Sequence, residues 1–223
     1  MPPDSTLGAT IRVWDWPTRA VHWLMALLIP FSWWSAENGL IDRHRLSGYT
    51  LLGLLLFRFI WGFVGSHASR FASFVRKPAT VWRYARGPTQ IREIGHNPLG
   101  GWSIVAMLLL LALQIGLGLF AVDEDGIESG PLSYLVDFDL GRTIAGLHHD
   151  LFRLLAALIA LHIATIFWRL LVRRDNLITA MITGRTRVPA AVEEPGMAPG
   201  WRAAVAILVS AMMVWLVARG LRF

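Results

Sequence analysis

Residues 144–172 read IAGLHHDLFRLLAALIALHIATIFWRLLV, an apolar run long enough to cross a bilayer, which takes about 20 residues. The run contains His148 and His162, fourteen residues apart. In a helix that spacing corresponds to ~21 Å along the axis, and both imidazoles face nearly the same way. One helix would therefore present a histidine at each of two depths in a membrane.

The composition predicts an integral membrane protein. Of 223 residues, 55% are hydrophobic, and there are 11 Trp and no Cys. Such a chain is too apolar for an ordinary soluble domain. We expect an all-α fold whose spans cover residues 18–36, 44–65, 100–122 and 144–172, with a shorter fifth span at 203–218. We expect residues 1–188 to form one helical domain, 189–200 a linker and 201–223 a C-terminal helical extension.

The charges of the loops predict an orientation in the membrane. The loop at residues 66–98 carries six Lys and Arg against one Glu, whereas residues 123–142 are strongly acidic. Because Lys and Arg accumulate on the cytoplasmic side, the first loop and the N-terminus should lie inside. The net charge of +6 then reflects orientation and attraction to anionic lipid, and no nucleic-acid partner is expected.

This orientation sorts four histidines into two pairs. His22 begins a helix that starts inside, so it should lie near the cytoplasmic face with His162. His44 begins a helix that starts outside, so it should lie near the outer face with His148. The sequence thus predicts two bis-imidazole sites stacked across the membrane.

Two imidazoles at one depth suit the axial positions of a haem iron, whose other four ligands come from the porphyrin. Zinc would need four ligands, and only two are in view at each depth. Without cysteine the haem would be haem b, held without covalent bonds. Arg58 lies inside an apolar helix and is a candidate for a haem propionate, or for a side chain that snorkels to the inner surface.

The remaining histidines have simpler interpretations. His149 points about 100° away from His148 and is expected to be a surface polar group. His67 is expected to be solvated. His96 belongs to a helix-entry turn with Asn97 as the cap, or alternatively lies beside a quinone headgroup or propionate. Gln114 is likewise either a structural polar group or a group beside a quinone headgroup or propionate.

Several blocks resemble the bacterial cytochrome b561-type family that includes the b-type cytochrome subunits of nickel-iron hydrogenases. The blocks are WDWPTR at 14–19 before His22, HRLSGY at 44–49, RFIWG at 58–62, GHNPLG at 95–100, LHHD at 147–150 and LH at 161–162. The likeness covers roughly residues 13–187 and implies a location in the bacterial inner membrane. It implies a four-helix bundle with two b haems, ligated by His22 and His162 on the cytoplasmic side and by His44 and His148 on the outer side.

The resemblance also implies electron exchange with quinone and with a redox protein such as a hydrogenase, a dehydrogenase or a cytochrome c. Our leading hypothesis is a dihaem electron relay between such a partner and the quinone pool. One alternative, also implied by the likeness, is a self-standing oxidoreductase that acts on superoxide at the outer haem, where Arg43 and Arg45 would attract the anion. The other is a non-redox membrane anchor or metal carrier.

Overall fold

The computed structural model describes residues 8–87, 95, 97–188 and 193–222. The long helices are α1 (Trp16–Glu37), α2 (Ile41–Val64), α5 (Pro98–Phe120), α6 (Phe138–Leu171) and α8 (Gly200–Ala218). The short elements are the helices α3 (Phe71–Phe74), α4 (Pro78–Arg86) and α7 (Leu177–Thr183), the 3-10 turns η1 (His67–Ser69) and η2 (Ser133–Leu135), and the strands β1 (Ala9–Arg12) and β2 (Arg185–Val188).

Four of the described helices, α2, α5, α6 and α8, are long and apolar enough to cross a membrane. The 22-residue helix α1 is not among them, because its Trp, Ser, His and Pro residues lower its mean hydropathy. The sequence predicts that α1 also spans, which would give five spans in all. Four long apolar helices are confirmed, and a fifth span, at α1, stays a prediction.

Polar caps determine where three of the long helices begin. The carboxylate of Asp15 accepts the backbone N–H of Thr18 at the start of α1, at 2.8 Å. Asn97 caps α5 in the same way, through the N–H of Gly100 at 2.7 Å, so the predicted cap is confirmed. Asp137 caps α6, which therefore begins at Phe138 rather than at residue 144.

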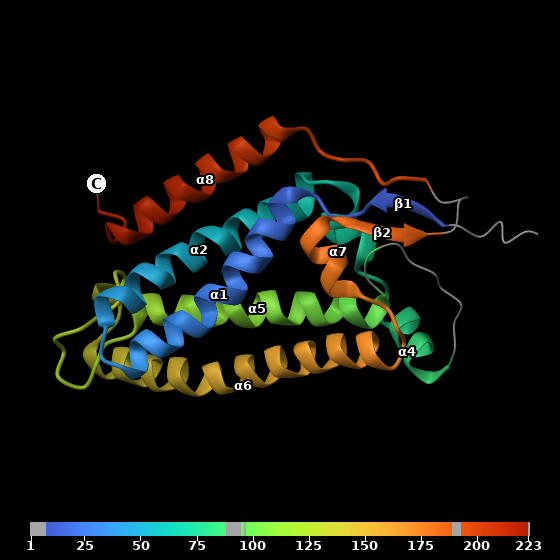
Figure 1. Cartoon of the computed structure of the whole chain (residues 1–223). Helices are drawn as coiled ribbons and strands as arrows, with labels where there is room; N and C mark the ends of the chain where they lie inside the picture. The colour runs from blue at the N-terminus through green and yellow to red at the C-terminus, as the bar shows by residue number, and fades with distance from the viewer. Residues whose placement is uncertain (1–7, 88–94, 96, 189–192, 223) are drawn as a thin grey trace, which may run out of the picture.

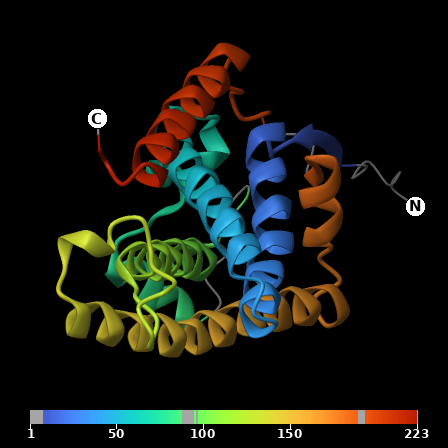
Figure 2. The same cartoon turned by 90° about the vertical axis from the view of Figure 1, so that its left-hand side faces the viewer.

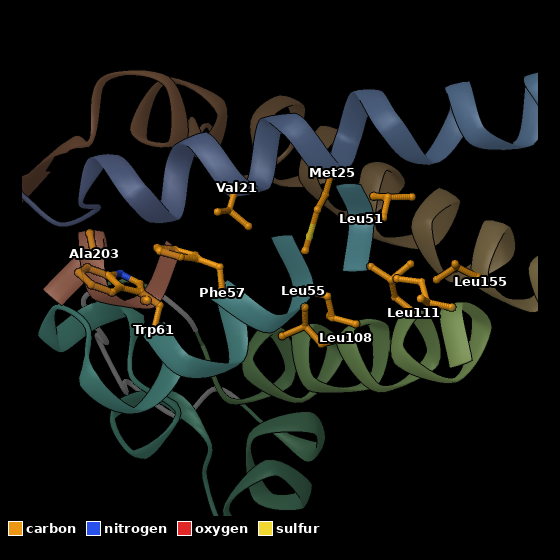
Figure 3. Close-up of a cluster of buried hydrophobic side chains, with 12 residues drawn as sticks. Val21, Met25, Leu51, Leu55, Phe57, Trp61, Leu108, Leu111, Leu155 and Ala203 are labelled. Atoms are coloured by element: carbon orange, nitrogen blue, oxygen red, sulfur yellow. The ribbon is translucent and has the colours of Figure 1, made fainter. Parts of the chain in front are cut away.

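The long helices pack in the order α8, α2, α5 and α6, with α1 beside α2, around a main apolar core. Figure 1 shows α8 along the outside of α2, with α6 at the opposite face of the molecule beside α5. Figure 2 shows the same order of helices from the side. The core in Figure 3 is contributed mainly by α1, α2 and α5, and it includes Met25, Leu55, Trp61 and Leu111. From α6 only Leu155 joins the fully buried part of this cluster.

The all-α fold class is confirmed, and the described residues add one small antiparallel sheet to it. β1 pairs with β2 in a register that sets Arg12 opposite Arg185 and Ala9 opposite Val188. Ile11 faces a second apolar cluster, with Val13, Trp14 and Ala180. The sheet joins the beginning of the described chain to the segment after α7, and strands of four residues leave too short a pattern to be predicted from sequence.

The C-terminal helix packs against the rest of the fold. Ala203 and Ala206 of α8 are almost fully buried in the main core, and Val214 lies 3.4 Å from where a Cβ on Gly53 of α2 would be. The predicted division at residues 188 and 200 stays a prediction, and residues 189–192 lie outside the described part of the chain.

Candidate functional site

The structure brings His44 of α2 and His148 of α6 together. Their ring centroids are 6.0 Å apart and their planes nearly perpendicular, at 86°. Both side chains are partly buried, and the two histidines are more than 100 positions apart in the sequence. The sequence predicts this pair from helix direction alone.

Each of these imidazoles is oriented by a backbone carbonyl. Nδ1 of His44 lies 2.8 Å from the carbonyl oxygen of Ser32 on α1, and Nδ1 of His148 lies 2.8 Å from that of Gln114 on α5. Because a carbonyl oxygen only accepts, each Nδ1 carries the proton and donates it, which places the ring's lone pair on Nε2. Histidines that bind metals through Nε2 are usually held in this way.

His22 lies on α1 and His162 on α6, and both side chains are partly buried. Nδ1 of His22 is buried, and within the described residues it has no hydrogen-bond partner. A buried polar atom without a partner is costly and commonly marks a site for a ligand, an ion or a water. The pairing of His22 with His162 stays a prediction.

Glycines lie beside the His44 and His148 pair. A Cβ on Gly118 of α5 would come 3.0 Å from Cε1 of His148 and 3.3 Å from its Nδ1. A Cβ on Gly48 or Gly116 would meet no atom within 4 Å. The absence of a side chain at Gly118 thus makes room for the ring of His148, and Gly48 and Gly116 leave the helix surfaces near the pair open.

Arg58 is buried near the start of α1. Its guanidinium donates to the carbonyl of Ser69 at 3.2 Å and lies 5.0 Å from the ring centroid of Phe71. Ser69 links it to Asp15, because the Ser69 hydroxyl donates to the Asp15 carboxylate at 3.1 Å. Arg58 is only 7% exposed, so it does not snorkel into open solvent in this structure. Its predicted contact with a propionate stays a prediction.

Asp15 is the centre of this polar cluster, and sequence reasoning missed its role. Its carboxylate accepts from Trp61 Nε1 at 2.9 Å and from Ser69 Oγ at 3.1 Å, besides the N–H of Thr18. Burial raises the pKa of Asp15, but hydrogen bonds from Ser66, Thr18 and Trp61 outweigh it and leave the pKa below its usual value. The signal was present in the sequence, since an Asp before Trp-Pro-Thr is a helix N-cap pattern.

The other predicted polar residues are found as follows. His67 is exposed, as expected, and so is His149, whose Nε2 is 3.1 Å from an Arg153 nitrogen. Gln114 is buried and its side-chain nitrogen binds the carbonyl of His148 at 2.9 Å. His96 lies outside the described residues. Arg45 is ion-paired with Glu128 of the acidic loop and with Asp42.

Comparisons with known proteins identify the family. The sequence pattern of the prokaryotic cytochrome b561 family matches residues 13–184. The chain is also 25% identical, over 209 residues, to a protein of Azotobacter chroococcum mcd 1 described as a probable Ni/Fe-hydrogenase B-type cytochrome subunit; the match covers 78% of this chain and 87% of that protein. No solved structure matches the chain. The chain therefore belongs to the prokaryotic cytochrome b561 family, which consists of membrane b-type cytochromes of electron transfer.

Proposed function

We propose that this protein binds two b haems, one between His44 and His148 and one between His22 and His162, and relays electrons across the membrane. The observation that carries the proposal is the His44 and His148 pair, with its centroid separation of 6.0 Å and both Nδ1 atoms on backbone carbonyls. Metal–nitrogen bonds are about 2 Å long, so two imidazoles on one metal have centroids roughly 6 Å apart. His44 and His148 would therefore be the residues that hold a haem iron at this site.

The donor set favours haem over another metal. Within the described residues no group of three or more His, Asp, Glu or Cys side chains is placed to hold a metal ion. A pair of imidazoles alone leaves a zinc ion two ligands short, whereas in haem the porphyrin supplies four nitrogens. When bound, the haem supplies a one-electron redox centre within the apolar bundle.

The chain's own residues hold and orient the two ligands. The carbonyls of Ser32 and Gln114 keep the Nδ1 protons of His44 and His148 in place, so that each Nε2 is available. The side-chain nitrogen of Gln114 lies 3.3 Å from Nε2 of His148 and donates to the His148 carbonyl at 2.9 Å. This amide would help to hold His148 in place beside the haem.

The helix α6 sets the distance between the two sites. His148 and His162 both lie on this continuous 34-residue helix, ~21 Å apart along its axis. With the N-terminus in the cytoplasm, as the loop charges indicate, the His22 and His162 site lies on the inner side. The two centres then form a path from one membrane face toward the other, with quinone as the membrane-soluble partner.

The relative from Azotobacter supports a redox enzyme of the hydrogenase class as the partner. The superoxide alternative is less well supported, because the ion pairs of Arg45 with Glu128 and Asp42 neutralise part of the positive charge beside His44.

Proteoliposomes test the relay. With duroquinol in the membrane and ferricyanide confined to the side of the His44 site, we expect haem b absorption bands to appear on reduction and ferricyanide to be consumed. His148→Ala should slow ferricyanide consumption by at least roughly tenfold, because the outer haem loses a ligand, while quinol still reduces the remaining haem. His149→Ala, with an exposed histidine, is the matched control. A protein without haem b bands, or one whose haem quinol cannot reduce, would refute the proposal.

A further inference from the structure

A large basic cavity lies between the sheet, α7 and the beginnings of α1 and α8, apart from the two histidine pairs. Its volume is about 1210 Å³. Five arginines line it, namely Arg12, Arg19, Arg174, Arg185 and Arg187. Within the described part of the chain none of the five forms an ion pair with a carboxylate.

The two carboxylates that line the cavity are already engaged. Asp15 accepts hydrogen bonds from Thr18, Trp61 and Ser69, and Asp175 is ion-paired with Arg169. The excess positive charge of the cavity is therefore not balanced by its own acidic residues.

The sheet concentrates this charge on one face. Arg12 and Arg185 are direct partners in the antiparallel register, and Arg187 lies opposite Thr10, two positions along on the same face. Ile11 alternates to the other face, where it packs on the second apolar cluster. Like charges directly opposite each other destabilise a strand pair, and a bound anion would remove that penalty.

Arg19 lines the same cavity, and one of its donors beneath the cavity wall has no partner in the described part of the chain. Its Nη1 donates to the carbonyl of Ile182, but its Nε is buried and has no partner among the described residues. Arg174 lies at the turn after α6 with φ of 53°, a left-handed conformation that is uncommon outside glycine. The αL turn places Arg174 at the cavity wall, with the arginines of the sheet.

We propose that this cavity binds a phosphate-bearing anion, most directly the headgroup of an anionic phospholipid. Basic pockets beside membrane helices on the cytoplasmic side bind headgroups of this kind. The cavity is also lined by Trp16 and Gly200, at the first turns of α1 and α8, and Trp16 is exposed. A lipid with its phosphates among the arginines would have apolar helix surface beside it for its acyl chains. This site does not depend on the proposed electron relay.

Binding of cardiolipin to the purified full chain in detergent tests the proposal, with phosphatidylcholine as the zwitterionic lipid and pyrophosphate as the soluble anion. Each arginine at an anionic surface is worth about fivefold in affinity, so Arg12→Gln with Arg185→Gln should weaken cardiolipin binding roughly 25-fold. Arg70→Gln with Arg83→Gln removes the same charge from exposed positions that do not line the cavity and should leave binding unchanged.

Thermal unfolding gives a second readout. Cardiolipin should raise the Tm of the native chain and of the control variant, but not that of Arg12→Gln with Arg185→Gln. Should that double variant not fold, Arg187→Gln alone should still lose about fivefold in affinity. Arginine-dependent binding of pyrophosphate as well as cardiolipin would identify a general phosphate site, and binding of cardiolipin alone a lipid site; both support the proposal. Equal cardiolipin affinity of the double variant and the native chain would overturn it.

Discussion

At the scale of single residues, Gly118 determines whether the ring of His148 keeps its position. Gly118→Ala places a Cβ 3.0 Å from Cε1 of His148, so the ring must shift and its bond to the Gln114 carbonyl is strained. Loss of such an orienting contact lowers metal affinity by about 10- to 100-fold, and we expect about tenfold weaker haem retention at this site. Haem titration of the apoprotein, followed by absorbance, measures it.

Gly116→Ala is the matched control for this prediction. It lies two residues away on α5, and its Cβ would meet no atom within 4 Å. Haem affinity should be unchanged, while the stability of α5 should rise slightly because Ala favours helix more than Gly does. Equal haem affinities for Gly118→Ala and Gly116→Ala would mean that the close approach of Gly118 to the His148 ring does not affect haem binding.

A second prediction at this scale concerns the buried carboxylate of Asp15. Asp15→Asn keeps a good helix cap but removes the charge near Arg58, and we expect a loss of about 1–3 kcal/mol in the free energy of unfolding. Because folding lowers the pKa of Asp15, its contribution is complete above the unfolded pKa of about 3.9 and is lost as the pH falls through the folded value.

Unfolding curves at a series of pH values check this. The difference between the native protein and Asp15→Asn should be constant at neutral pH and should shrink only below about pH 4. A difference that is absent at neutral pH, or that grows under acid conditions, would contradict the assigned role. Asp42→Asn, at an exposed carboxylate, serves as the control.

At the scale of elements, α8 is part of the core through its small residues. Ala206→Leu adds three carbons at a position that is 1% exposed, and overpacking of this kind costs about 1–3 kcal/mol. Since α8 packs on α2 at the face away from α6, the haem spectrum of the folded protein should not change. Ala204→Leu, at an exposed neighbouring position, is the control for thermal unfolding. Equal Tm values for both variants would show that α8 is not docked on α2.

Hydropathy and helix direction predict the long elements well. The five expected spans correspond to α1, α2, α5, α6 and α8, and their ends differ by a few residues where a cap such as Asp137 starts the helix earlier. The pairing of β1 with β2 was not predictable, because it joins segments about 175 residues apart through only four residues each. The Asp15 cluster was missed for a similar reason: its partners Trp61 and Ser69 come from other elements.

The proximity of His44 and His148 was predictable because helices that cross a membrane fix the depth of each side chain. Depth along the bilayer normal follows from the position of each histidine in its helix, so direction alone pairs His44 with His148. The hydrogen bonds that orient those rings were not predictable, since they come from backbone carbonyls, at Ser32 and Gln114, that the sequence does not distinguish from others.

At the scale of the whole molecule, the central claim is that α6 carries one ligand of each of two haems. Haem content and redox titration of purified His162→Ala and His44→Ala, compared with the native protein and with His149→Ala, test this most directly. We predict two haems in the native protein and in the control. His162→Ala and His44→Ala should each keep one haem. The midpoint potential of the haem that is left should differ between these two variants. A native protein with a single haem, or two variants that keep the same haem, would contradict this arrangement.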